Sequence, residues 1–171
     1  PSDTTRLYVD LTDTENMNRL TKNLDSQSSY IIGMNNHQGS RFSEYRHGLE
    51  LAVEELKARG LMACDSRTIS DSVFYDVAQE KAVPAAERDL FIDGGSTAQT
   101  RDLVVQLATR AIYAPNDTHA GIGHPRTATV SGLMEAKAEL EKMGVTIRPI
   151  SRAATIVVET DNQPEGCSVD F

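Results

Sequence analysis

The feature that most constrains the fold of this chain is a regular alternation of short apolar runs with amphipathic segments. The apolar runs are typical of buried strands, and the segments between them carry apolar residues at helical spacing. We predict strands at 30–34, 61–64, 89–92, 119–122 and 145–147. We predict helices after a capping box at Thr12 and Glu15, and over 44–59, 70–80, 96–111 and 127–143.

Strands that alternate with helices predict an α/β fold with parallel βα repeats, because a helix usually makes the crossover between parallel strands. Such a sheet is either doubly wound or closed into a barrel. The predicted strands are not long Val/Ile runs, which disfavours a doubly wound sheet, and a barrel needs more strands than these five. We therefore expect either an open sheet or a barrel whose first strands are absent from this chain. The pattern dissolves after Ser151, so we expect residues 152–171 to be a C-terminal tail.

Composition excludes some classes of function. The net charge of −8 argues against binding to a nucleic-acid backbone. No apolar run approaches the roughly 20 residues that a membrane span needs. Cys64 and Cys167 lack metal-ligand spacing, and Cys64 lies in an apolar run, where we expect a small buried side chain. A disulfide between the two cysteines stays open, and with it the redox compartment.

Small and polar residues follow every predicted strand. The carboxyl ends of parallel strands meet in one crevice, so these residues are expected to converge. They are Asn35, Asn36, His37, Gln38, Gly39, Ser40 and Arg41; Asp65, Ser66, Arg67 and Thr68; Asp93, Gly94 and Gly95; Gly123, His124, Pro125 and Arg126; and Ser151. Each group alone is also typical of turns, caps or loop histidines. Their occurrence together at one end of the sheet favours a functional site.

The residue types in this crevice indicate metal chemistry. Two neutral imidazoles, His37 and His124, are typical zinc ligands, and a carboxylate usually completes such a site. Water on the metal would then attack a polarised carbonyl. Asp65 would orient a histidine or transfer a proton. Arg67 or Arg88 would fix that aspartate or bind an anionic intermediate. The sequence contains neither a phosphate-binding glycine loop nor a nucleophile elbow.

Five ordered segments of the chain resemble the divergent polysaccharide deacetylase family. They lie at 33–42, 54–61, 65–68, 88–93 and 122–125, within a resemblance from about Leu7 to Ser151. The resemblance implies a distorted β/α barrel of about seven strands, of which residues 1–151 form the C-terminal two-thirds. Family members begin with a strand that ends in paired aspartates, followed by a loop with His and Glu. That part of the pattern is absent here.

The resemblance also implies an enzymatic activity and a cellular location. Family members are expected to be bacterial, periplasmic or secreted hydrolases that use zinc or another divalent metal to remove acetyl groups from N-acetylated sugars of an envelope polysaccharide. It implies metal binding by His37 and His124, although the superfamily's closely spaced histidine pair is represented by His37 alone. The catalytic residues would be Asp65, Arg67 and Asp93. The substrate-binding residues would be Asn35, Asn36, Ser40, Arg41 and Arg88.

Two other classes of function remain open from the sequence. The same fold can serve as a non-catalytic glycan-binding or scaffold module. Residues 48–55 also resemble one helix of periplasmic binding proteins. The expected partners are a polysaccharide or oligosaccharide, and either the missing N-terminal segment or a second copy of the chain. Without the paired aspartates, we expect this chain alone to be inactive.

Overall fold

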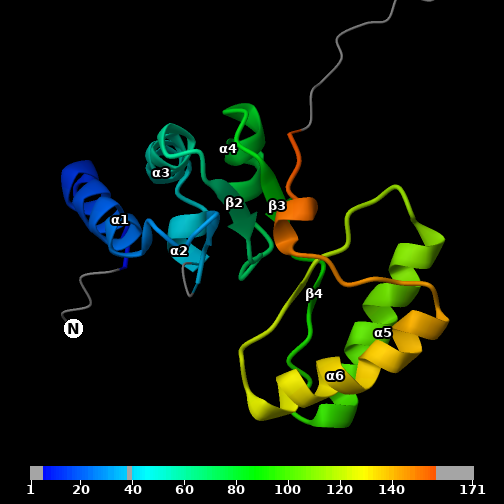
Figure 1. Cartoon of the computed structure of the whole chain (residues 1–171). Coiled ribbons are helices and arrows are strands. Elements are labelled where there is room, and N and C mark those ends of the chain that lie inside the picture. The colour runs from blue at the N-terminus through cyan, green and yellow to red at the C-terminus, as the bar shows by residue number, and fades with distance from the viewer. Residues whose placement is uncertain (1–5, 38–39, 157–171) are drawn as a thin grey trace, which may run out of the picture.

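The computed structural model describes residues 6–37 and 40–156, and it consists of two small parallel sheets with helices packed around them (Figure 1). The first sheet has the order β1-β2-β3, with β1 at Gly33–Asn35, β2 at Met62–Asp65 and β3 at Ala85–Glu87. The second sheet pairs β4 (Leu90–Phe91) with β5 (Gly121–Ile122). Every ladder is parallel, which confirms the predicted parallel α/β fold. Closure into a barrel stays a prediction.

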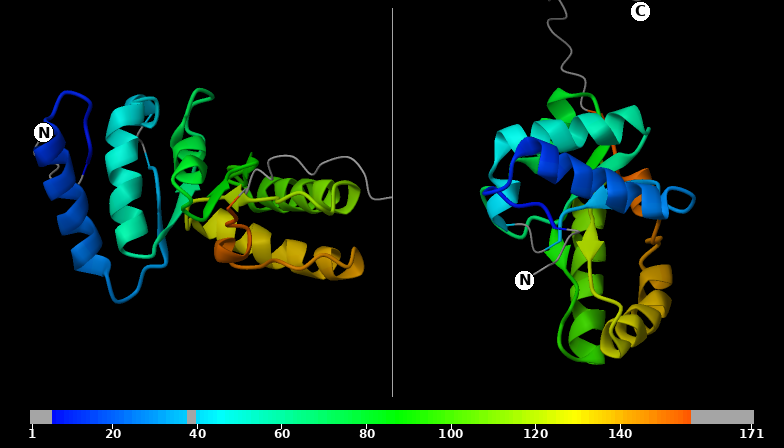
Figure 2. Two further views of the ribbon diagram at one scale, coloured as in Figure 1. Left: turned by 90° about the horizontal axis from the view of Figure 1, so that it is seen from above. Right: turned by 90° about the vertical axis from the view of Figure 1, so that its left-hand side faces the viewer.

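Helices α1 (Asp13–Gln27), α3 (Arg46–Ala58) and α4 (Phe74–Glu80) lie side by side in that order (Figure 2), and α3 and α4 contact the first sheet. The short helix α2 (Ser40–Ser43) precedes α3, and the 3-10 helix η1 comprises Ile150–Arg152. Helices α5 (Thr97–Tyr113) and α6 (Thr127–Lys142) pack against each other beside the second sheet. Within the described ranges, no helix is long and apolar enough to cross a membrane.

The helix ends follow local chemistry in the sequence. The backbone N–H of Glu15 donates to Thr12 Oγ1 at 3.3 Å and that of Thr12 donates to Glu15 Oε2 at 2.9 Å, so the predicted capping box begins α1. Ser96 Oγ accepts from the N–H of Gln99 at 3.2 Å and caps α5. Gly60 follows α3 with φ of +67°, a conformation that favours glycine and ends the helix.

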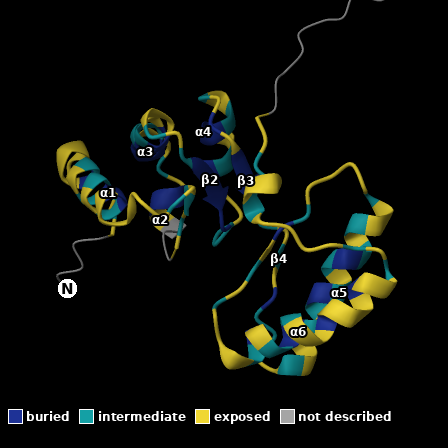
Figure 3. Cartoon of the chain, in the orientation of Figure 1, coloured by how far each residue is buried: buried dark blue, intermediate teal, exposed yellow. Residues whose placement is uncertain are grey.

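Two larger hydrophobic cores and a smaller third cluster hold these layers together (Figure 3). The first fills the space between α1, α3, α4 and the first sheet, where Leu56, Phe74 and Val77 have no exposed surface. The second lies between α5, α6 and Ile92. A Cβ at Gly132 would lie 2.5 Å from the Cβ of Thr100, so α6 approaches α5 too closely for any larger residue there. The third cluster consists of Met62, Cys64 and Ala86, and Ile122 of β5 and Ile150 of η1 pack against it.

Two of the predicted elements differ from the structure. The strand predicted at 145–147 is wrong, because these residues form no ladder and run as an extended connection to η1. Strand β3 was not predicted, since Ala-Ala-Glu lacks the β-branched and aromatic residues that signal a strand. The beginning of the predicted tail packs on the first sheet, where Thr155 forms an antiparallel bridge with Ala85. Residues 157–171, which include Cys167, lie outside the described residues.

Candidate functional site

The structure brings together the two histidines that the sequence placed at strand ends. His37 follows β1 and His124 follows β5, so they come from different sheets. Their ring centroids lie 5.6 Å apart with an interplanar angle of 74°, an edge-to-face contact. The His124 side chain is 44% exposed, and His37 is also exposed. Two accessible imidazoles therefore face each other at the carboxyl ends of β1 and β5.

Asp93 holds the His124 ring in place. Its Oδ2 lies 2.5 Å from His124 Nδ1, and its two oxygens accept from the backbone N–H of His124 at 2.9 and 3.1 Å. Thr129 Oγ1 donates to Asp93 Oδ1 at 3.0 Å. A carboxylate at Nδ1 favours the tautomer with its proton there, which leaves the Nε2 lone pair of His124 available as a ligand or base.

The electrostatics of Asp93 agree with this geometry. Partial burial acts to raise the pKa of Asp93, but the hydrogen bonds from the His124 ring, the His124 backbone and Thr129 outweigh it and lower the pKa. Asp93 is therefore a carboxylate at neutral pH. Its contacts suit it to orienting a histidine rather than to taking a proton from substrate.

Gly123 and Thr129 complete this arrangement; Gly123 was expected in the crevice without a role of its own, and Thr129 was not predicted. A Cβ at Gly123 would lie 3.0 Å from Asp93 Oδ1 and 2.8 Å from Ile92 Cγ1, so the chain directly after β5 passes close to Asp93 only with glycine at this position. Thr129 lies in the first turn of α6 and is buried. The available signal was a glycine directly before the histidine and a hydroxyl residue five positions after it.

Asp65 is placed differently from Asp93. It ends β2 and has no exposed surface. Its two oxygens accept from Asn36 Nδ2, Ser72 Oγ and the backbone N–H groups of Arg67 and Tyr75. A carboxylate with this set of donors and no accessible surface is poorly placed to exchange a proton with a substrate.

The predicted arginines contact protein groups near β3 and the preceding loop. Arg67 pairs with Glu87 and has φ of +45°, an unusual conformation for a large side chain. Arg88 donates to the carbonyl oxygens of Ser66 and Arg67, both at 2.7 Å, and its guanidinium lies 3.9 Å from the Phe91 ring centroid. Burial lowers the pKa of Arg88. These contacts brace the loop after β2.

The remaining predicted substrate-binding residues lie around the loop after β1. Asn35 is exposed and donates to Ser66 Oγ at 3.1 Å, whereas Asn36 is half-buried and bonded to Asp65. Arg41 lies 4.0 Å from Asp10 in a largely exposed ion pair. The side chain of Ser40, together with Gln38 and Gly39, lies outside the described residues.

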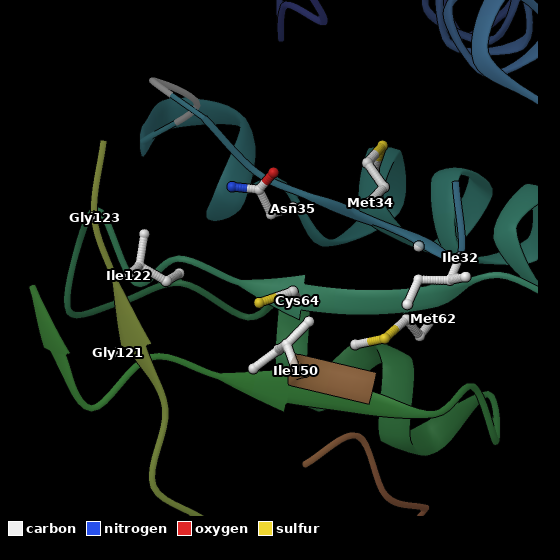
Figure 4. A pocket seen from close by; sticks show the side chains of 10 residues that line it. Ile32, Met34, Asn35, Met62, Cys64, Gly121, Ile122, Gly123 and Ile150 are labelled. Carbon is white, nitrogen blue, oxygen red and sulfur yellow. The ribbon is translucent and has the colours of Figure 1, made fainter. Parts of the chain in front are cut away.

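A groove of about 350 Å³ runs between β1, β2 and β5 (Figure 4). Asn35 and Gly123 lie toward the same end of the groove. Asn35 comes shortly before His37 in the chain, and Gly123 comes directly before His124. Apolar side chains line the rest, among them Ile32, Met34, Met62, Cys64, Ile122 and Ile150. Burial, with a smaller contribution from Asp65, raises the pKa of the Cys64 thiol to about 11. Cys64 is therefore an unreactive lining residue, as predicted from its apolar run.

The donor set fits part of a metal site. His37 and His124 supply two imidazoles, the ligand type that zinc shares with other divalent transition metals. Asp93 supplies the carboxylate that commonly supports a metal-binding histidine from behind. Among the described residues, no three His, Cys, Asp or Glu side chains cluster closely enough to bind a metal by themselves.

Comparisons with known proteins agree with the resemblance noted in the sequence. The model of the divergent polysaccharide deacetylase family matches residues 2–154. The uncharacterised protein YibQ of Escherichia coli is 27% identical over 158 residues, which cover 91% of this chain and 49% of YibQ. An uncharacterised protein of Haemophilus influenzae is 31% identical over 119 residues, which cover 67% of this chain and 42% of that protein. The chain thus spans about half the length of these relatives.

A solved structure supports the fold independently of these sequences. The crystal structure of an uncharacterised protein from Agrobacterium tumefaciens superposes with a TM-score of 0.72 at 20% identity. The match covers 84% of this chain and 57% of that one, and at this identity it bears on the fold alone. With a family match over nearly all of the described residues and a neighbour of the same fold, the chain belongs to the divergent polysaccharide deacetylase family.

Proposed function

We propose that the full-length protein is a metal-dependent hydrolase that removes acetyl groups from N-acetylated sugars of an envelope polysaccharide. The observation that carries the proposal is the edge-to-face pair of His37 and His124, with Nδ1 of His124 held by Asp93. Membership of the family supports the hydrolase and carbohydrate theme. The proposed cofactor is zinc or another divalent metal, and the proposed location is the periplasm or the exterior of a bacterial cell.

Each residue has a defined task in this proposal. Asp93 keeps a proton on Nδ1 of His124, so the Nε2 lone pair of His124 is available as a ligand. His37 contributes the second imidazole. A bound divalent metal supplies Lewis-acid polarisation of an amide carbonyl and activates water near neutral pH. The overall reaction consumes one water, breaks the C–N bond of the acetamide, and yields acetate and an amino sugar.

The groove beside the histidines suits this substrate class. Its lining is mainly apolar and accommodates a methyl group, while Asn35 places an amide next to the site for a sugar hydroxyl. The net charge of −8 suits a neutral or cationic glycan better than an anionic one. Removal of acetyl groups leaves amines, so the product becomes more cationic than the substrate.

The test uses the full-length protein as wild type, His37→Ala and His47→Ala. His47 is the matched control, because it is an exposed histidine on α3 bonded to Asp13 at 2.9 Å. We expect His37→Ala to lose zinc and to lose acetate release from N-acetylated oligosaccharides, and we expect His47→Ala to keep both. Unchanged zinc content and acetate release in His37→Ala would remove His37 from the site.

The alternative is a non-catalytic glycan-binding module on the same fold. One observation favours this alternative: the carboxylates of Asp65 and Asp93 already accept several hydrogen bonds within the protein, which leaves them less available for catalysis. Wild-type protein that binds no zinc and releases no acetate, yet binds the same oligosaccharides in a titration, would replace the hydrolase with this module.

A further inference from the structure

Asp65 is the most buried charged group of the described site region, with an exposed fraction of 0%. Its Oδ1 accepts from the N–H of Arg67 at 2.8 Å and from Asn36 Nδ2 at 3.0 Å. Its Oδ2 accepts from Ser72 Oγ at 2.7 Å and from the N–H of Tyr75 at 3.3 Å. These donors come from the loops after β1 and β2 and from the first turn of α4, so one carboxylate ties three segments together.

Asn36 connects this carboxylate to the loop that carries His37. Its Nδ2 donates to Asp65 and also to Ser43 Oγ at 2.8 Å, while its Oδ1 accepts from the N–H of Ser66 at 2.6 Å. Both ends of the amide are therefore engaged, which fixes the orientation of the side chain and of the backbone from which His37 follows. Asn35, one residue earlier, is exposed, and its side chain donates to Ser66 Oγ at 3.1 Å.

The structure assigns Asn36 and Asp65 to positioning His37 opposite His124. The two halves of the histidine pair are then held by separate networks, since Asp93 and Thr129 hold His124 from the other sheet. Asp65 serves this site through buried hydrogen bonds rather than through proton transfer. The inference rests on the proposed function for the nature of the ligand, but the ring contact itself is present without one.

The test is the ring contact, measured by nuclear Overhauser effects between the His37 and His124 ring protons in histidine-labelled full-length protein. We expect the effect in the wild type, its loss in Asn36→Ala and its retention in Asn35→Ala. We also expect Asn36→Ala to bind zinc about 10- to 100-fold more weakly, as measured by competition with a chromophoric chelator, because outer residues that orient metal ligands have effects of this size. Retention of the ring contact in Asn36→Ala would overturn the inference.

Asp65→Asn separates positioning from proton transfer. The amide keeps the size of the side chain but has one acceptor oxygen in place of two, so the network around Asn36 loosens. We expect the ring contact and the zinc affinity to fall together. An Asp65→Asn protein that keeps both and loses only acetate release would show that Asp65 transfers a proton, and would overturn the inference.

A wild-type measurement covers the case in which these variants do not fold. The side-chain amide protons of Asn36 and the backbone amide proton of Ser66 should exchange with solvent much more slowly than the side-chain amide protons of the exposed Asn35. Equal exchange rates would overturn the inference. Failure of the wild type to bind zinc would instead contradict the proposed function, and the ring-contact comparison would still decide the role of Asn36.

Discussion

Asp93→Asn is the substitution whose consequences the structure defines most closely. The carboxylate uses both oxygens, because Oδ2 faces His124 Nδ1 while Oδ1 accepts from Thr129 Oγ1 and from the backbone of His124. An asparagine has one acceptor oxygen; if that oxygen keeps the bonds from Thr129 and the His124 backbone, an NH2 group faces His124 Nδ1, so the charge-assisted bond from the Nδ1 proton is lost and the tautomer protonated at Nε2 is favoured. A hydrogen bond to a charged group contributes about 1.5–3 kcal/mol. The side chain is only 14% exposed, so solvent replaces little of that contribution.

We therefore expect Asp93→Asn to lower the free energy of unfolding by about 1.5–3 kcal/mol, measured by denaturant titration. In addition, ¹⁵N chemical shifts of His124 should show loss of the single tautomer protonated at Nδ1. Asp102→Asn is the matched control, because Asp102 is an exposed carboxylate on α5 that pairs with the adjacent Arg101. Its effect should stay below about 0.5 kcal/mol. An Asp93→Asn protein with wild-type stability and an unchanged His124 tautomer would refute the reasoning.

Three further predictions concern the same region. Gly123→Ala should destabilise the protein and weaken zinc binding by the full-length form, because the new methyl group would lie 2.8 Å from Ile92 and 3.0 Å from Asp93. Calorimetry measures the stability and chelator competition the zinc affinity, and wild-type values of both would contradict the close approach of residue 123 to Asp93. The stability difference between the wild type and Asp93→Asn should shrink as pH falls below 3.8, the ordinary pKa of an aspartate, because the lowered pKa of Asp93 in the folded state stabilises the fold above that pH and this contribution is lost as the folded-state carboxylate becomes protonated. A stability difference that is constant from pH 7 to pH 2 would contradict this prediction. The chain alone should self-associate, because in the described part β1 pairs with β2 alone and β5 with β4 alone, which leaves one edge of each strand unpaired, and Ile32 beside β1 is 60% exposed. Sedimentation that shows a stable monomer at high concentration, or no effect of Ile32→Lys on association, would contradict this prediction.

The helices and the convergence of His37 and His124 were the most predictable parts of this structure. Apolar spacing and capping residues such as Thr12 and Ser96 act within a few residues of sequence, so α1 and α5 follow from local information. The rule that parallel strands carry sites at their carboxyl ends placed His37 and His124 in one crevice, and their rings lie 5.6 Å apart. Neither of these inferences needed long-range contacts.

The parts that could not be predicted depend on such contacts. Val145-Thr146-Ile147 has the composition of a strand, but a strand also needs a neighbour, and these residues form no ladder. Strand β3 forms without strand-like residues, because β2 supplies the partner backbone. Asp65 and Asp93 both lie at the carboxyl ends of strands, and nothing local distinguishes them. Their surroundings do, since Ser72 and Asn36 enclose Asp65, whereas Asp93 faces an imidazole.

The central claim is that His37 and His124 together bind a divalent metal while Asp93 keeps Nδ1 of His124 protonated. The most direct measurement is a zinc titration of full-length protein labelled with ¹⁵N at histidine, followed through the ring nitrogens. We predict that a ring nitrogen of His37 and Nε2 of His124 shift in parallel as zinc is added, while His124 keeps its proton on Nδ1 and the exposed His47 does not respond. Zinc that leaves the His37 and His124 resonances unchanged would contradict the account.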